Sequence, residues 1–223
     1  MTRTRGVGAS RPAARKLLCC GAVAGPFFAT VFLIEGMRRA DYKPLRHPVS
    51  SLSLGPRGWV QVTNFAAAGM LYLAGAAGLS RSPESTECRR FGSAVLGATG
   101  LGLLGSAKFK TDPVSGYPPG TPHVPIERTP TGKMHDSAAL PIFLGIPTAA
   151  FACAWRFQRY GRRGWALYSG ATGVLMVIST GLFGAGFAQK EGLVDVAGLF
   201  QRLAIVTGFG FLSALSVRAL RRP

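Results

Sequence analysis

The distribution of charge along this 223-residue chain constrains its fold more than any other feature. Only 16% of the residues are charged, compared with roughly 25% in ordinary soluble domains. The charged residues are clustered between apolar runs of about twenty residues, the length at which a helix crosses a hydrocarbon core about 30 Å thick. The pattern predicts an all-α, multi-pass protein of the cell membrane, with the lipid bilayer as its main partner.

We expect one membrane domain over residues 1–223, built as a bundle of six transmembrane helices. The expected spans cover residues 17–36, 59–79, 91–109, 135–155, 165–188 and 198–217, with a long extracytoplasmic loop over residues 110–134. The third span is rich in Gly and Ala, which let helix backbones approach closely. We therefore expect it to lie centrally in the bundle.

The basic residues predict the orientation of the chain. Of the 26 Lys and Arg residues, 15 lie in the segments on the side of the two termini and 9 in the links on the other side. The positive-inside rule then places both termini in the cytoplasm. The four cysteines fall on that side, so we expect no structural disulfide. The net charge of +17 is explained by basic residues that flank the spans, and no nucleic-acid motif accompanies them, so we expect no nucleic-acid partner.

The polar residues that are uncommon in a membrane protein gather on the predicted outer side. We expect a pocket there that binds a lipid headgroup or a small polar ligand. The candidate ligand-binding residues are His47, Asn64, Asp112, Tyr117, His135 and Arg202. Three of them, Asn64, Asp112 and His135, are predicted to approach one another.

Glu35, at the outer end of the first span, is an ionisable group at membrane depth. Such a group is costly unless it is paired. We expect an ion pair with Arg202 first, or with Lys108 or Arg38.

Other interpretations of the same residues remain open. The polar groups could form a structural lid over the helix ends, with Asp112 capping a turn and His135 hydrogen-bonding the loop. A membrane-embedded hydrolase or transferase could use Ser50, His135 and Asp112 or Asp136. It could instead use zinc, a cofactor that the sequence does not demand, because no metal-binding spacing is present. The candidate zinc ligands would be His47, His123, His135 and Asp112. A small transporter is a further alternative.

Three segments, residues 41–69, 109–118 and 131–139, resemble the bacterial membrane-protein family named domain of unknown function 998. The resemblance covers nearly the whole chain. It implies a six-helix integral membrane protein and no particular reaction. The matching residues are His47, Pro48, Ser50, Asn64, Asp112, Pro113, Tyr117 and His135. More distantly, the chain is similar to the damage-regulated autophagy modulator family of membrane proteins.

Overall fold

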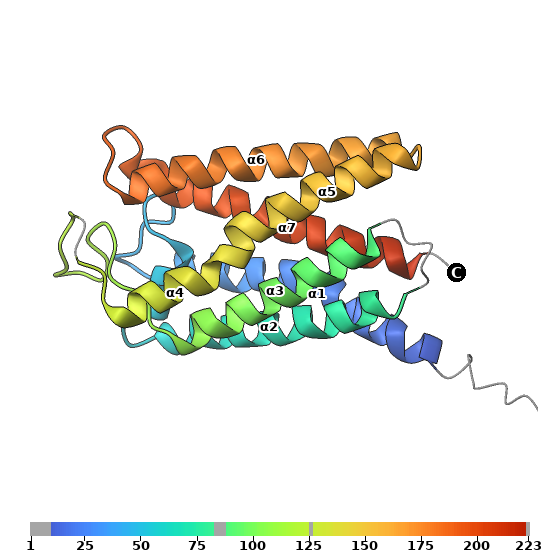
Figure 1. The fold of residues 1–223 in the computed structure, drawn as a ribbon. Coiled ribbons are helices and arrows are strands. Elements are labelled where there is room, and N and C mark those ends of the chain that lie inside the picture. Colours follow the sequence, from blue (N-terminus) through green and yellow to red (C-terminus); the bar gives the residue numbers. More distant parts are fainter. Residues whose placement is uncertain (1–9, 83–87, 125–126, 222–223) are drawn as a thin grey trace, which may run out of the picture.

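A computed structural model describes residues 10–82, 88–124 and 127–221, and these residues form six helical rods and no strand (Figure 1). The rods are α1 (Ser10–Met37), α2 (Gly58–Ser80), α3 (Arg89–Lys108), a bent rod, α6 (Arg163–Phe187) and α7 (Ala197–Leu220). The bent rod consists of α4 (Pro130–Leu140), a π-helical turn η2 (Pro141–Gly145) and α5 (Ile146–Arg159). Two short 3-10 helices, η1 (Val49–Ser53) and η3 (Val194–Val196), lie in the links.

Each expected span corresponds to one of these rods, with ends that differ by a few residues. Among the described residues, five rods are long and apolar enough to cross a membrane: α1, α2, the bent rod, α6 and α7. The expected all-helical, membrane-compatible fold is therefore confirmed. The crossing by α3 stays a prediction, because its many glycines make it less apolar than the other five rods.

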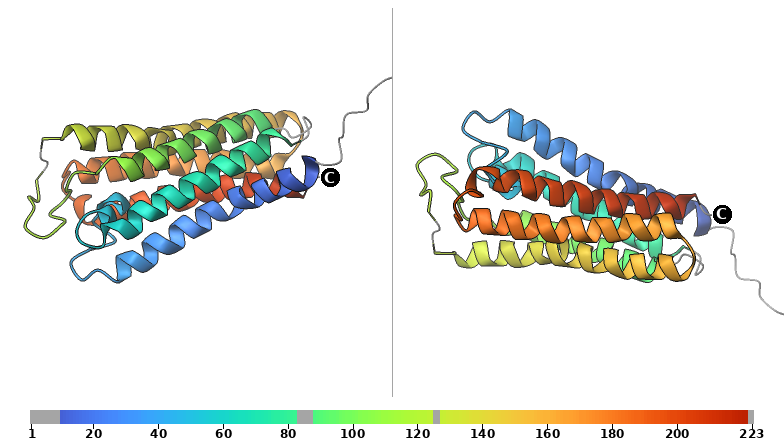
Figure 2. Two further views of the ribbon diagram at one scale, coloured as in Figure 1. Left: turned by 90° about the horizontal axis from the view of Figure 1, so that it is seen from below. Right: turned by 90° about the horizontal axis from the view of Figure 1, so that it is seen from above.

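The rods form a closed ring in chain order (Figures 1 and 2). Each rod packs against the next, and α7 closes the ring by packing against both α6 and α1. We name the two ends of the bundle by what they hold. The loop end carries the links 38–57, 109–129 and 188–196, and the terminus end carries the start of α1 and the end of α7.

Of the five apolar rods, α7 is the most buried. Its contact with α1 is close, because a Cβ atom on Gly25 would lie 2.9 Å from the Phe209 carbonyl oxygen. The expectation of a central α3 is wrong, since α3 lies in the ring between α2 and α4 and a smaller share of its residues is buried than in α7. The expected close packing of α3 is present. A Cβ on Gly100 would lie 2.8 Å from the Gly69 carbonyl oxygen of α2.

The bent rod changes neighbours partway along its length. Its α5 part packs against α6, whereas its α4 part packs against α3. The change occurs at η2, between Pro141 and Pro147, where a proline cannot donate the helical hydrogen bond of the preceding turn. Local π adjustments make such prolines tolerable within a membrane helix. The consequence is that α4 and α6 separate toward the loop end (Figure 1).

A disulfide joins Cys88, which precedes α3, to Cys153 in α5. The two Cα atoms lie 5.5 Å apart, within the normal range for a disulfide. The expectation of no structural disulfide is therefore wrong. It rested on the compartment alone, whereas the packing of α3 beside α5 brings these two cysteines together across 65 residues of sequence. Cys19 and Cys20 are free.

Candidate functional site

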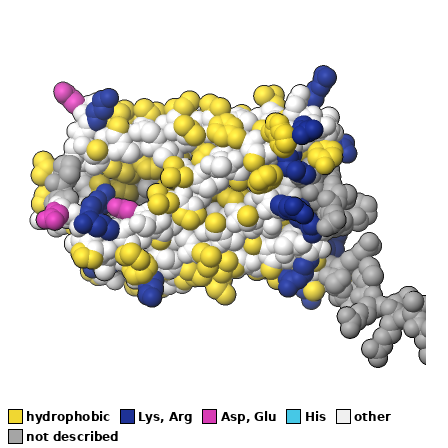
Figure 3. Space-filling view, in the orientation of Figure 1, with side chains coloured by type: hydrophobic (Ala, Val, Ile, Leu, Met, Phe, Trp, Pro, Cys, Tyr) yellow, Lys and Arg dark blue, Asp and Glu magenta, His cyan; other side chains and the backbone are white. Residues whose placement is uncertain are grey.

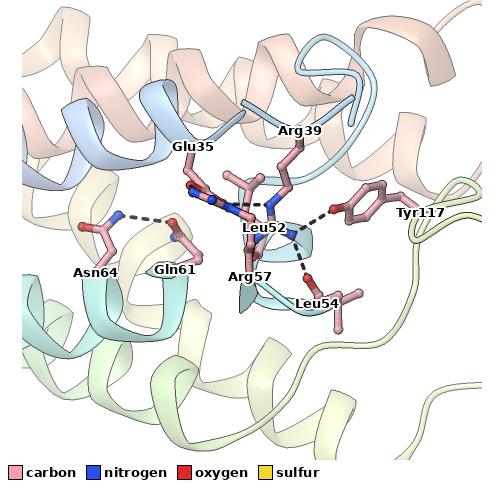
Figure 4. Close-up of polar contacts among 8 residues, drawn as sticks. All are labelled: Glu35, Arg39, Leu52, Leu54, Arg57, Gln61, Asn64 and Tyr117. Atoms are coloured by element: carbon pink, nitrogen blue, oxygen red, sulfur yellow. Dashed lines mark hydrogen bonds and ion pairs between the residues drawn. The ribbon is translucent and has the colours of Figure 1, made fainter. Parts of the chain in front are cut away.

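Glu35 lies near the loop end of α1, where it is buried in an ion-pair cluster (Figure 4). Its carboxylate accepts hydrogen bonds from Arg39 Nε at 3.0 Å and from Arg57 Nε and Nη2 at 3.0 and 2.8 Å. The expectation that this carboxylate is ion-paired is confirmed, but the expected partners are wrong. The link after α1 turns back at once, so Arg39, one helical turn after Glu35, and Arg57, at the start of α2, reach it first.

Arg39 also connects two links to the helix ends. Its Nη1 atom donates to the Leu54 carbonyl at 2.7 Å and to the Tyr117 hydroxyl at 2.9 Å, and Nη2 donates to the Leu52 carbonyl at 2.7 Å. The Arg39 side chain is 8% exposed, and four different acceptors surround its guanidinium group. The cluster therefore holds the links 38–57 and 109–129 against α1.

Arg202 of α7 occupies a separate buried position. It donates through Nη1 to the carbonyls of His47 and Gly198 at 3.1 and 2.9 Å, and through Nη2 to the Tyr42 hydroxyl. Its guanidinium group also lies over the Tyr42 ring, 5.5 Å from the centroid. Backbone carbonyls and an aromatic ring face stabilise the guanidinium charge, so no acidic partner is needed to explain this placement.

His47 packs against Tyr42 and Tyr117, with ring centroids 5.5 and 5.2 Å away. Its Nδ1 atom accepts a hydrogen bond from the Lys43 backbone N–H at 2.9 Å. Burial, together with the charge of Arg46, lowers the pKa of His47 to about 4. The ring is therefore neutral at pH 7. His47, Tyr117 and Arg202, three of the candidate ligand residues, come together here. Protein groups bond to His47 Nδ1, the Tyr117 hydroxyl and both Nη atoms of Arg202, whereas Arg202 Nε is buried without a hydrogen-bond partner among the described residues.

The three links at the loop end are bonded to one another and form a roof over the helix ends. Arg46 pairs with Asp195 at 2.5 Å and donates to the Ser115 carbonyl at 3.3 Å. Gln189 donates to the Ser115 hydroxyl at 2.8 Å. The loop over residues 110–134 is thus folded back onto the bundle in its described part.

Asp112 fixes the start of α4. Its two carboxylate oxygens accept hydrogen bonds from the Thr129 backbone N–H at 3.0 Å and from the Thr129 hydroxyl at 2.7 Å. Thr129 is the N-cap of α4, and its hydroxyl oxygen accepts from the Gly132 N–H. The carboxylate also lies so close to Gly132 that a Cβ atom there would overlap it. An acidic group at a helix N-terminus is favourable, so this arrangement explains the burial of Asp112.

Asn64 lies at the interface between α1 and α2. Its amide nitrogen donates to the Phe28 carbonyl at 3.1 Å and to Gln61 Oε1 at 3.2 Å. The three residues predicted to converge thus have separate partners: Asn64 contacts α1, Asp112 contacts the N-cap of α4, and His135 contacts the Phe109 carbonyl through Nδ1 at 2.9 Å.

A metal site would need several ligating side chains to converge on one point. Among the described residues, no group of three or more His, Cys, Asp or Glu side chains is placed to share a metal ion. The side chain of His123 is exposed and lies against Gly116, whereas His47 and His135 are buried in different surroundings.

A cavity of about 540 Å³ opens at the loop end, where α4 and α6 separate. The residues nearest the loop end supply most of its polar lining: Ser50, Ser106, Thr111, Arg128, His135, Asp136 and Gln201; Thr180 adds one hydroxyl group deeper in α6. Deeper in the helices its walls are apolar and largely aromatic: Phe28, Phe65, Leu103, Ile142, Phe143, Phe183, Ile205 and Phe209. Figure 3 shows this face, hollowed toward the loop end and walled by hydrophobic side chains. The volume lies within the usual range for small-molecule sites.

The sequence reasoning identified three residues of this cavity, Ser50, His135 and Asp136, as candidate catalytic residues, and missed most of the remainder. Arg128 and Asp136, which form an ion pair at 3.6 Å in the cavity wall, were not taken together as a site. The sequence signal that could have revealed the cavity is the proline pair of the fourth span, Pro141 and Pro147. Prolines bend the rod, and the bend separates α4 from α6.

The comparisons with known proteins agree with the helical organisation. A family model described as "Protein of unknown function (DUF998)" matches residues 22–218, nearly the whole chain. Neither the curated proteins nor the solved structures gave a match. The more distant similarity to the damage-regulated autophagy modulator family is not shown by these comparisons.

Proposed function

This chain belongs to the DUF998 family of proteins of unknown function, and we propose that it is a six-span protein of the cell membrane that binds a lipid-like amphiphile in the cavity between α4 and α6. The observation that carries the proposal is the two-part lining of the cavity. Apolar, aromatic walls suit an acyl or isoprenoid chain. The polar residues near the loop end, including Arg128 and His135, suit a headgroup.

In this proposal the loop end faces outward and both termini lie in the cytoplasm. The excess of Lys and Arg at the terminus end supports that orientation. The disulfide between Cys88 and Cys153 also lies at that end. Because its cysteines are 3% and 0% exposed, reducing thiols have poor access to it, so the bond is compatible with the cytoplasmic side.

A hydrolase acting in the same cavity is the second candidate, favoured by one observation. Ser50 and His135 both line the cavity. Asp112, the acid expected to complete the group, is held by Thr129 instead. Binding is therefore the better-supported function, and Ser50→Ala separates the two. It would abolish turnover of a bound ester but leave its binding intact.

The experiment that tests binding uses two glycines of α6. Gly184 lines the cavity, and a Cβ atom there would meet nothing within 4 Å, so Gly184→Trp fills the cavity without a backbone clash. Gly181 has the same open surroundings but does not line the cavity, so Gly181→Trp is the matched control. Wild type and both variants are purified in mild detergent, and the co-purifying lipids are extracted and identified by mass spectrometry.

We expect wild-type protein and Gly181→Trp to retain one amphiphile in near-stoichiometric amount, and Gly184→Trp to lose it at unchanged thermal stability. Equal retention by Gly184→Trp and wild type would show that the cavity is not the binding site.

A further inference from the structure

A second recess lies on the outside of the bundle, along the seam between α5 and α6. It is an open groove of about 1020 Å³, distinct from the cavity described above. Small side chains form much of its lining, and larger apolar ones border it: Ala154, Gly164, Ala166, Gly170, Ala171, Trp155, Leu167, Val174, Leu175 and Ile178. Two polar residues, Gln158 and Arg163, complete the lining at the terminus end.

The terminus end of this groove is strongly basic. Arg163 lines it, and Arg159 lies over the exposed Trp155 ring, 4.9 Å from the centroid. Residues 154–178 contain four arginines and no Asp or Glu. Tryptophan is enriched where a bilayer meets water, so Trp155 marks the depth at which a lipid headgroup would lie. Figure 3 shows Lys and Arg gathered at this end of the molecule.

We propose that the α5–α6 groove is a binding site for an anionic phospholipid. The acyl chain lies along the small residues of the seam, and the phosphate contacts the guanidinium groups of Arg163 and Arg159. Arginine binds phosphate through paired N–H donors, and the first turn of α6 adds the positive end of a helix dipole. A zwitterionic lipid fits the apolar groove equally well, but its cationic group would meet arginine side chains at the headgroup position, and residues 154–178 offer no Asp or Glu to pair with it. The charge of the groove therefore selects for a net negative lipid.

The test measures lipid preference directly. Wild-type protein is reconstituted in nanodiscs made of equal parts phosphatidylcholine and phosphatidylglycerol, transferred to mild detergent, and analysed by native mass spectrometry for retained lipids. We expect phosphatidylglycerol to be retained in preference to phosphatidylcholine. Removing one cationic contact with Arg163→Gln should lower this preference about fivefold.

A second variant tests the apolar part of the groove. A Cβ on Gly170 would lie 3.9 Å from the Ala154 Cβ, which is ordinary contact, so Gly170→Leu extends into the groove. It should reduce the retention of both lipids. Gly210→Leu is the control, because Gly210 lies on an exposed face of α7 with nothing within 4 Å of its Cβ position.

Three results would overturn the proposal. The first is equal retention of the two lipids by wild type, or an unchanged preference in Arg163→Gln. The second is loss of the retained phosphatidylglycerol in Gly184→Trp, which would place that lipid in the cavity instead. The third is a dimer that Gly170→Leu dissociates, because the groove would then hold a helix of a second copy.

Discussion

Replacing Arg39 with glutamine should remove the buried half of the ion-pair cluster at the loop end. The variant loses the pair with Glu35 and the hydrogen bonds to the Leu52 and Leu54 carbonyls and the Tyr117 hydroxyl. Breaking a buried ion pair costs about 3–5 kcal/mol, mainly because the remaining charge is left without a partner. Here a second arginine still neutralises the carboxylate, so we expect a loss near the lower bound, about 3 kcal/mol.

The matched control is Arg57→Gln, which removes the other partner of the same carboxylate. The Arg57 side chain is 54% exposed, compared with 8% for Arg39, so water and counterions replace its contacts. The free energy of unfolding is measured by titrating the purified protein in mild detergent with SDS and following helicity by circular dichroism. Arg39→Gln should be clearly less stable than Arg57→Gln. If the two variants lose equal stability, burial does not determine the strength of this cluster and the reasoning is wrong.

Three further predictions concern packing, pH and orientation. Gly100→Leu should strongly lower the melting temperature, since its Cβ would lie 2.8 Å from a carbonyl oxygen of α2. Gly97→Leu should be tolerated, because the nearest atom to its Cβ would be 3.7 Å away, and equal melting temperatures of the two variants would contradict this. Burial lowers the pKa of His47 to about 4, so the unfolded state binds a proton first as the pH falls below about 6.5. The free energy of unfolding should therefore decline between about pH 6.5 and 4, by at most about 1.4 kcal/mol per pH unit. In an unfolding titration, His47→Gln should flatten that dependence. The orientation is tested in a background without Cys19 and Cys20, with an impermeant thiol reagent on intact cells. The reagent should label a cysteine placed at exposed residue 191 and not one placed at exposed residue 160, and the reverse labelling would invert the orientation.

Much of the fold could be predicted from the sequence because its determinants are local. Charge clusters and helix breakers lie between the apolar runs, so every expected span has its helix. The high burial of α7 was not predictable in this way. It depends on which rods pack against which, and the glycines of α3 look equally suited to a central place.

The site was predicted less completely, because its geometry depends on contacts between distant residues. An ion-pair partner for Glu35 could be predicted, because burying an unpaired carboxylate near the end of an apolar run costs too much free energy. Its actual partners depend on the path of the link 38–57, which α7 and the roof over the helix ends determine. The cavity exists because the bent rod changes its neighbouring helix at η2, from α3 to α6. The positions of polar residues in the sequence do not indicate such a change.

The closure of the ring by α7 has a consequence for how the protein is made. The ribosome produces this helix after the other five rods, yet the first helix packs against it and the link 38–57 is held by its Gln201 and Arg202. Until it arrives, α1 presents an uncovered seam to lipid, and the His47 carbonyl and the Val49 N–H lack their hydrogen-bond partners in α7. In the proposed six-span arrangement, biogenesis is therefore expected to pass through a stage with five inserted helices that insertion factors must shelter. Nascent chains that terminate before α7 should be rapidly degraded rather than accumulate as a smaller bundle.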